Sequence, residues 1–193
     1  VENEQLRSEN LVNQFEALKN QLNPHMLFNS LNTLRSLIRE TPDNAQDYLQ
    51  ELSRVLRYTL QGNECMSVTL REEMEFVNAY NFLLKMRYEE NLEFDIRIEE
   101  EAETLQLPPM SVQLLIENAV KHNEISNRHP LVIRVCTTGK QLTVSNPIQR
   151  KKTASGGLQI GLANLAKRYS LLFKEEIEVR EDNNTFIVTI PLI

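Results

Sequence analysis

His25 stands directly after Asn23-Pro24, where two apolar repeats along a long helical segment fall out of phase. The upstream repeat consists of Leu11, Phe15, Leu18 and Leu22, and the downstream repeat consists of Leu27, Leu31, Leu34 and Ile38. Proline lacks an N–H and disfavours helical geometry at the preceding residue, so we expect a kink at Asn23. Imidazole is largely neutral, and therefore nucleophilic, near pH 7. His25, with Asn29 one turn on, is thus placed for chemistry in water, although a lone histidine beside a kink is ordinarily a surface residue.

A second group of polar side chains lies on the predicted helix from Met110 to about His122. Leu115 and Ala119 follow an apolar stripe, and Glu117, Asn118 and Lys121 are expected on the opposite side. An amide oxygen can enter the octahedral shell of Mg2+, and an ammonium group can face phosphate oxygens. These residues could therefore hold a magnesium–triphosphate group. On chemistry alone, a solvated helix face with a Glu117–Lys121 pair is the more common arrangement.

Three of the five glycines, Gly156, Gly157 and Gly161, lie just before a helix predicted from about Leu162 to Leu172. Glycine lets backbone amides approach a phosphate, and the N-terminus of a helix favours an anion. The pattern is consistent with a phosphate-binding loop, although glycines also mark ordinary loops.

The composition limits the classes of function. The chain has 193 residues and a net charge of −6, which argues against a nucleic-acid-binding surface, because such surfaces are usually basic. Cys65 and Cys136 lack metal-ligand spacing and fit a reducing cytoplasm better than a disulfide framework. No segment reaches the apolar length that a bilayer span needs. We therefore expect a cytoplasmic chain without direct nucleic-acid binding.

The first elements that must position these groups are two helices within residues 1–63. The first covers about residues 4–39, and the second ends near Gln61. The second helix has an apolar repeat of its own, made of Ala45, Leu49, Leu52 and Leu56. A helical hairpin with two such seams can bury them by pairing with a second hairpin, so we expect a homodimeric four-helix bundle.

Residues 64–193 are predicted to form a second domain. Thr69 either ends a short strand or caps the helix that carries Phe76 and Tyr80. Strands are expected at 94–98, 131–138, 141–145, 177–179 and 186–190, with helices at 110–122 and 162–172, where Pro109 would occupy the first helical turn. This order predicts a mixed sheet covered on one face by helices, and hence an α+β chain.

The window around His25 resembles the phosphoacceptor region of the LytS-like sensor histidine kinases, which reads Gln-x-Asn-Pro-His-Phe-Leu-Phe-Asn. This chain matches it at Gln21, Asn23, Pro24, His25, Leu27, Phe28 and Asn29, with Met26 in place of the usual Phe. By this resemblance His25 is the phosphorylated residue.

The segment Pro109–His122 resembles the N-box of the GHKL (Bergerat) ATP-binding fold, which is shared with gyrase and ATP-dependent chaperones. The resemblance implies that Asn118 binds Mg2+, that Lys121 and His122 lie near the phosphates of ATP, and that Glu117 belongs to the same site. Members that hydrolyse ATP carry Glu four residues before this Asn. Leu114 occupies that position here, which favours phosphoryl transfer to a side chain over a chaperone-type ATPase.

The glycines resemble a second conserved box of the same family. Gly157, Gly161 and Leu162 would then contact the nucleotide, and Arg150-Lys151-Lys152 would belong to a lid over ATP. The chain departs from the family at Asn146-Pro147, where most histidine kinases have Asp-x-Gly and the Asp accepts a hydrogen bond from adenine. The neutral amide of Asn146 can still accept that bond, but we expect a lower affinity for ATP.

The resemblance implies a helical-hairpin dimerisation and phosphoacceptor domain at 1–63 and a GHKL α/β sandwich that binds ATP at 64–193. It implies a homodimeric kinase core that autophosphorylates His25 and passes the phosphoryl group to an aspartate of a response regulator. The full-length protein would be a membrane-anchored sensor whose cytoplasmic portion includes this chain. The alternative is a kinase-derived scaffold that dimerises and binds a regulator without phosphorylating it.

Overall fold

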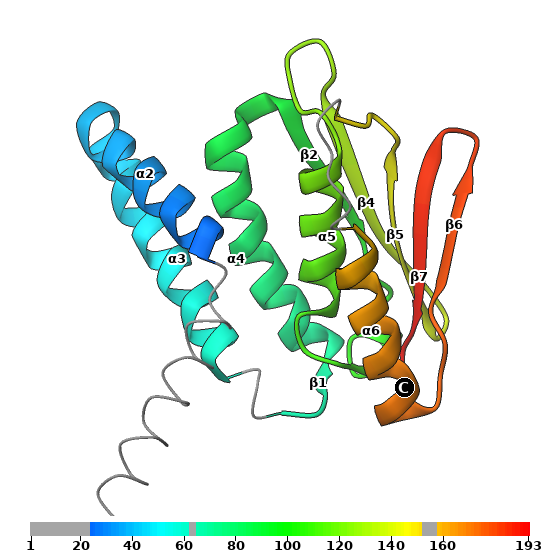
Figure 1. Ribbon diagram of the computed structural model, residues 1–193. Helices are drawn as coiled ribbons and strands as arrows, with labels where there is room; N and C mark the ends of the chain where they lie inside the picture. Colours follow the sequence, from blue (N-terminus) through cyan, green and yellow to red (C-terminus); the bar gives the residue numbers. More distant parts are fainter. Residues whose placement is uncertain (1–23, 62–64, 152–157) are drawn as a thin grey trace, which may run out of the picture. The chain divides into compact units, whose positions relative to one another are not determined.

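The computed structural model describes residues 24–61, 65–151 and 158–193 (Figure 1). Contacts along the chain divide it into two compact units, Val1–Asn63 and Glu64–Ile193. The expected kink at Asn23 and the upstream apolar repeat lie outside the described residues, and so do Gly156 and Gly157. Each unit is described by itself below.

The first unit is a helical hairpin made of α2 (Pro24–Glu40) and α3 (Pro42–Gln61). α3 begins at Pro42, whose missing N–H costs nothing in the first turn. Only Thr41 separates the two helices, and its N–H still bonds to the carbonyl of Leu37 at 2.8 Å. The second helix therefore begins at Pro42, earlier than the apolar repeat alone suggests.

The buried face of α3 differs from the predicted one. It consists of Ala45, Tyr48, Leu52, Val55 and Thr59, whereas Leu49 is 50% exposed. The seam of Ala45, Leu49, Leu52 and Leu56 is predicted to pair with a second hairpin, which a single chain does not test. Within the chain, Tyr48 and Val55 on a neighbouring stripe are buried, and Leu49 is not. On α2, the large apolar side chains of Phe28, Leu31 and Ile38 are also exposed.

The second unit contains a five-stranded sheet in the order β2-β4-β5-β7-β6. The strands are β2 (Leu92–Arg97), β4 (Leu131–Thr138), β5 (Gln141–Pro147), β6 (Glu178–Asp182) and β7 (Thr185–Pro191). β2 runs parallel to β4, and the remaining neighbours are antiparallel. All five residues of the outer strand β6 are exposed. A two-stranded sheet, β1 (Val68–Thr69) with β3 (Gln106–Leu107), stands apart from the larger one.

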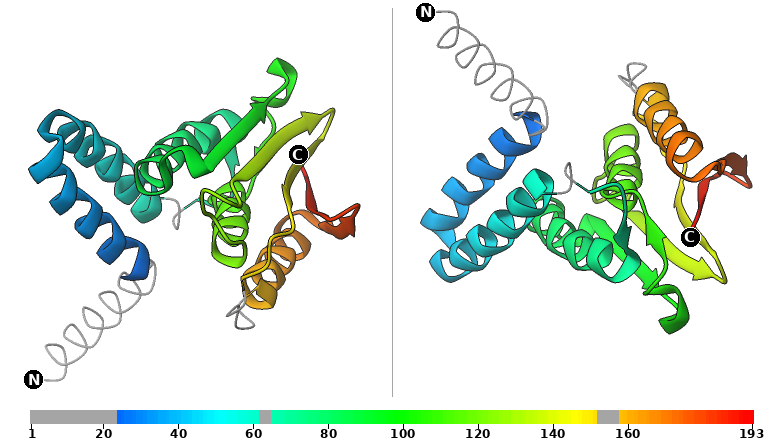
Figure 2. Two further views of the ribbon diagram at one scale, coloured as in Figure 1. Left: turned by 90° about the horizontal axis from the view of Figure 1, so that it is seen from above. Right: turned by 90° about the horizontal axis from the view of Figure 1, so that it is seen from below.

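Three helices cover one face of this sheet, namely α4 (Leu70–Tyr88), α5 (Ser111–His122) and α6 (Leu158–Phe173) (Figures 1 and 2). Two single-turn helices, η1 (Glu89–Asn91) and η2 (Glu100–Ala102), flank β2. The core between the layers contains Ile133, Val135, Leu142 and Val144 from the sheet and Val77, Val112, Ile116 and Leu165 from the helices. The expected α+β architecture, a helical hairpin followed by a sandwich with helices on one face of a mixed sheet, is confirmed.

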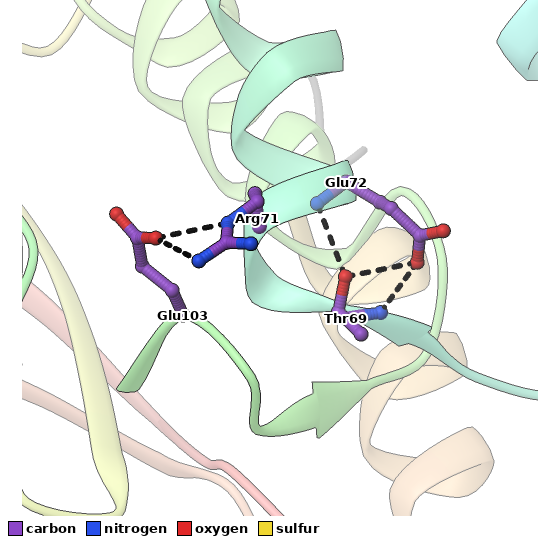
Figure 3. Close-up of polar contacts among 4 residues, drawn as sticks. All are labelled: Thr69, Arg71, Glu72 and Glu103. Carbon is purple, nitrogen blue, oxygen red and sulfur yellow. Dashed lines mark hydrogen bonds and ion pairs between the residues drawn. The ribbon is translucent and has the colours of Figure 1, made fainter. Parts of the chain in front are cut away.

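The sequence left open whether Thr69 ends a strand or caps a helix, and in the structure it does both. It ends β1 and also caps α4, because its hydroxyl accepts the N–H of Glu72 while the Glu72 carboxylate accepts the N–H of Thr69 at 2.8 Å (Figure 3). Beside it, Arg71 forms an ion pair with Glu103 at 2.8 Å. This capping box fixes where α4 begins and hence which of its side chains face α5.

Two helix boundaries differ from prediction. α5 begins at Ser111, and Met110 caps it in a left-handed conformation (φ 63°). Pro109 therefore precedes the helix and does not occupy its first turn. α6 begins at Leu158, so Gly161 lies inside the helix and not in a loop before it.

Candidate active site

Asn118 lies at the centre of the candidate site, on α5. Its side chain is only 9% exposed, and among the described residues its Nδ2 has no hydrogen-bond partner. Asn118 is thus buried whereas Lys121 is exposed, so the alternative of one solvated face does not hold for Asn118. It lies on the covered side of α5 and faces α6. An amide that is buried without a partner is costly unless a ligand completes it.

Gly161 is the residue of α6 that lies against Asn118. A Cβ placed at Gly161 would lie 3.6 Å from Oδ1 and 3.7 Å from Nδ2 of Asn118, and 3.9 Å from Cδ2 of Leu114. The structure thus brings Gly161 against Leu114 and Asn118 of α5, which lie one helical turn apart and 43 or more positions before Gly161 in the sequence. Leu162 follows Gly161 and is half-buried, whereas Asn164 is exposed.

Lys121 and His122 end α5, and they differ in exposure. Lys121 is exposed and His122 is half-buried, and the Nε2 of His122 has no hydrogen-bond partner in the part of the chain that the structure describes. Burial lowers the pKa of the His122 imidazole below its ordinary value, and the positive charges of Lys121 and Lys151 lower it further. A bound anion would reverse the effect of these charges, since it favours the protonated ring.

Lys151 fastens the C-terminal end of α5 to the segment that follows β5. Its Nζ donates to the carbonyls of Val120 (3.1 Å) and Lys121 (3.0 Å), and its backbone N–H donates to the carbonyl of His122 (3.1 Å). A cation at the carbonyl end of a helix is favoured by the helix dipole. Burial and the charge of Arg87 lower the pKa of Lys151. The sequence places Lys151 in a lid but gives no sign of this anchoring role.

Glu117 points toward α4. Its carboxylate accepts a hydrogen bond from Nε2 of Gln113 at 2.9 Å. The negative charge of Glu117 and, above all, burial raise the pKa of the Tyr80 phenol, which lies on α4. Glu117 thus bonds to Gln113 one turn earlier on α5 and acts through its charge on Tyr80 of α4.

Asn146 is 4% exposed and lies near the end of β5, opposite Phe186 of β7. Its Nδ2 donates to the carbonyl of Pro147 at 2.7 Å. Because the amide nitrogen is turned toward Pro147, the amide oxygen of Asn146 points away from Pro147. An amide oxygen in that orientation can accept a hydrogen bond from an amino group.

His25 and Asn29 lie one turn apart on α2, in the first unit. The Nδ2 of Asn29 is 3.2 Å from Nδ1 and 3.4 Å from Nε2 of the imidazole. His25 is exposed, and Thr33 hydrogen-bonds to the carbonyl of Asn29 at 3.0 Å. An exposed imidazole beside a fixed amide can act as a nucleophile toward a group brought to it from solvent.

Comparison with known proteins gives the family. Residues 13–92 match the family model described as histidine kinase. The chain is 34% identical to Sensor protein LytS of Streptococcus agalactiae, over 83% of this chain and 30% of that protein. It is 37% identical to Sensor histidine kinase/phosphatase LytS of Staphylococcus aureus (strain MRSA252), over 56% of this chain and 19% of that protein.

The chain belongs to the LytS-like histidine kinases. It spans about 30% of the length of the Streptococcus agalactiae LytS protein. Solved structures with a similar course of the chain include the cytoplasmic segment of histidine kinase QseC (TM-score 0.48, 11% identity, 66% of this chain and 76% of that chain). The catalytic domain of histidine kinase ThkA is another (TM-score 0.45, 18% identity, 65% and 94%). The family match favours a sensor kinase core over the scaffold alternative.

Two further observations concern metals and membranes. Within the described ranges, no helix is long and apolar enough to cross a membrane. In the same ranges no cluster of three or more His, Cys, Asp or Glu side chains could hold a metal ion. Mg2+ commonly takes most of its oxygen ligands from phosphate and water and only one or two from side chains. The orphaned amide of Asn118 fits one such ligand, because its oxygen and nitrogen exchange places by a half-turn.

Proposed function

We propose that this LytS-like chain is the cytoplasmic kinase core of a two-component sensor, which transfers the γ-phosphoryl group of ATP to His25. The observation that carries the proposal is the buried, unpartnered amide of Asn118 against Gly161. A nucleotide with its metal ion would supply a partner to this amide, whose Nδ2 has none among the described residues.

Each candidate residue has a chemical role in this proposal. Asn118 would supply an amide oxygen to Mg2+, which when bound offsets the charge that develops on the phosphates. Lys121 and His122, at the end of α5, would face the phosphates. Asn146 would accept the adenine amino group. The N-terminal part of α6, with Gly161 and Leu162, and the preceding Gly157 would let the backbone approach the phosphates.

The transfer itself is a single displacement. A neutral ring nitrogen of His25 attacks the γ-phosphorus, an N–P bond forms, and the bond between that phosphorus and the bridging β-oxygen breaks to release ADP. Asn29 holds the imidazole from one turn away. The phosphoryl group then passes to an aspartate carboxylate of a response regulator, and the imidazole is regenerated.

The direct test is incubation of the chain with γ-labelled ATP and Mg2+. We expect label on the protein that is lost in acid and retained in alkali, because a phosphoramidate N–P bond hydrolyses when the nitrogen is protonated. Label that resists acid would indicate a hydroxyl acceptor and contradict the proposal. The absence of label at millimolar ATP would favour the scaffold alternative.

The proposed homodimer gives a prediction about the first unit. Phe28, Leu31, Ile38 and Leu49 are exposed in a single chain, and pairing with a second hairpin would bury them. We expect a dimer in sedimentation at micromolar concentration and a shift toward monomer in Leu49→Asp. Leu171→Asp is the control, since Leu171 is 66% exposed on α6 in the other unit. A monomeric wild-type chain would contradict the bundle.

The adenine site gives a second prediction. Asn146→Asp should tighten binding of a non-hydrolysable ATP analogue about fivefold, because a charged acceptor exceeds a neutral one by about 1 kcal/mol. The same change removes the Nδ2 donor to Pro147 and should lower the free energy of unfolding by about 1 kcal/mol. Asn146→Ala should weaken binding. Calorimetric titration and urea unfolding measure the two effects separately, and equal affinities in all three forms would show that Asn146 does not contact adenine.

A further inference from the structure

Glu73 is a charged side chain that the proposed reaction does not use, yet it is completely buried (0% exposed) in the first turn of α4. Burial of a carboxylate is costly unless strong donors satisfy it. Two backbone N–H groups do so: Oε2 accepts from Met110 at 2.9 Å and Oε1 accepts from Val112 at 3.0 Å. Both oxygens of the carboxylate are thus aimed at the N-terminus of α5.

No other side chain of the described residues is seen to cap the start of α5. Met110 is the N-cap residue and supplies no side-chain hydrogen bond, and its backbone has φ 63° and ψ 16°. Free N–H groups at a helix N-terminus require an acceptor, and a negative charge there is favoured by the helix dipole. Glu73 therefore supplies from α4 the cap that residues 108–111 do not supply themselves.

A hydrogen bond from α6 also holds the segment at the start of α5. Nη1 of Arg168 donates to the carbonyl of Pro109 at 2.8 Å, and the hydroxyl of Ser111 donates to the carbonyl of Pro108 at 2.6 Å. Tyr169 lies nearby on α6, and the negative charge of Glu73 is one of the causes that raise its pKa, after burial. The N-terminus of α5 is thus held from α4 by an acceptor and from α6 by a donor.

We infer that Glu73 is a positioning residue for the nucleotide site, which sets the axial position of α5 so that Asn118 lies against Gly161. Asn118 follows Val112 by six residues on one rigid helix, and Gly161 lies on the helix that also carries Arg168. A shift of α5 along its axis therefore changes the distance between Asn118 and Gly161 directly. The inference rests on the proposed function only where it concerns the nucleotide.

The test compares Glu73→Gln with Thr137→Val. A glutamine has one acceptor oxygen, so one of the two N–H groups loses its partner and faces an NH2 group. Thr137 is buried on β4, and its hydroxyl accepts the N–H of Glu99 at 2.7 Å. Thr137→Val therefore also leaves one backbone N–H without its acceptor, but away from α5, and it controls for loss of stability alone.

The first readout is affinity for ATP with and without Mg2+. Outer partners that orient a metal ligand typically change metal affinity by about tenfold or more when removed, so Glu73→Gln should raise the Kd for ATP in Mg2+ about tenfold. The Kd without Mg2+ should rise by a smaller factor, because the adenine contact proposed for Asn146 lies on β5 and does not move with α5. Thr137→Val should change neither. Equal weakening of both affinities in Glu73→Gln, or no weakening, would overturn the inference.

The second readout does not need nucleotide. Amide hydrogen exchange in Glu73→Gln should accelerate along α5 as far as Asn118, and the side-chain amide resonance of Asn118 should shift. Acceleration confined to Met110 and Val112, with an unchanged Asn118 resonance, would show a local cap and overturn the inference. If the wild-type chain binds no ATP, the proposed function fails while this readout still decides the role of Glu73.

Discussion

His25→Gln is expected to abolish labelling by γ-labelled ATP, with the signal reduced to background. The glutamine amide nitrogen shares its lone pair with the carbonyl group and cannot attack phosphorus, whereas the neutral imidazole can. His25 is exposed on α2, so we expect the fold of the variant to be unaffected. Circular dichroism and thermal unfolding of the variant would verify this.

The matched control is His129→Gln. His129 is exposed and pairs with Glu124 at 3.1 Å on the loop before β4, and it has no role in the proposed reaction. It should label like the wild type. Label that persists in His25→Gln and disappears in His129→Gln would move the acceptor to the second unit and remove the assignment of His25.

Asn118→Ala is expected to uncouple ATP binding from Mg2+ and, at the same time, not to weaken the fold. Loss of a hydrogen-bonded or metal-bound amide should raise the Kd for ATP in Mg2+ at least tenfold, which is about 1.4 kcal/mol. The Nδ2 of Asn118 has no partner among the described residues. Removal of an unsatisfied buried group costs little or stabilises, so the free energy of unfolding should stay level or rise.

Asn81→Ala provides the comparison. Asn81 is 6% exposed on α4, and both of its side-chain amide atoms lack a hydrogen-bond partner within the described ranges. Its removal should have the same effect on stability as Asn118→Ala but leave the Mg2+ dependence of binding unchanged. If the two variants behave alike in calorimetry, the unpartnered amide of Asn118 is only an imperfection of the core and not part of a nucleotide site.

Local sequence signals predicted the fold wherever neighbouring residues decide it. The capping residues Thr69 and Glu72 lie three positions apart, and the turn at Gly139 joins β4 to β5. Leu49 marks the limit of such signals, because a repeat of four and three residues fits two adjacent stripes of a helix, one buried within the chain and one exposed in it. The choice between them depends on the packing of Tyr48 and Val55 against the partner helix, and no window of sequence contains that information.

The candidate site was predictable by residue type but not by environment. Asn118, Lys121 and His122 were singled out by their resemblance to a family motif, whereas the burial of Asn118 follows from its contact with Gly161 across two helices. Glu73 was missed because a glutamate in the first turn of a helix is ordinarily an exposed residue that favours the helix dipole. Only the fold shows that the carboxylate oxygens of Glu73 accept backbone N–H groups at the start of a different helix, α5.

The two outer strands of the sheet have a consequence for solubility and handling of the chain. β2 carries Glu93, Asp95 and Arg97, and β6 carries Glu178, Arg180, Glu181 and Asp182. An open edge invites a strand from another molecule, and charged side chains along that edge make such pairing unfavourable. The sheet should therefore resist edge-to-edge aggregation in concentrated solution, and self-association of this chain is left to its helices.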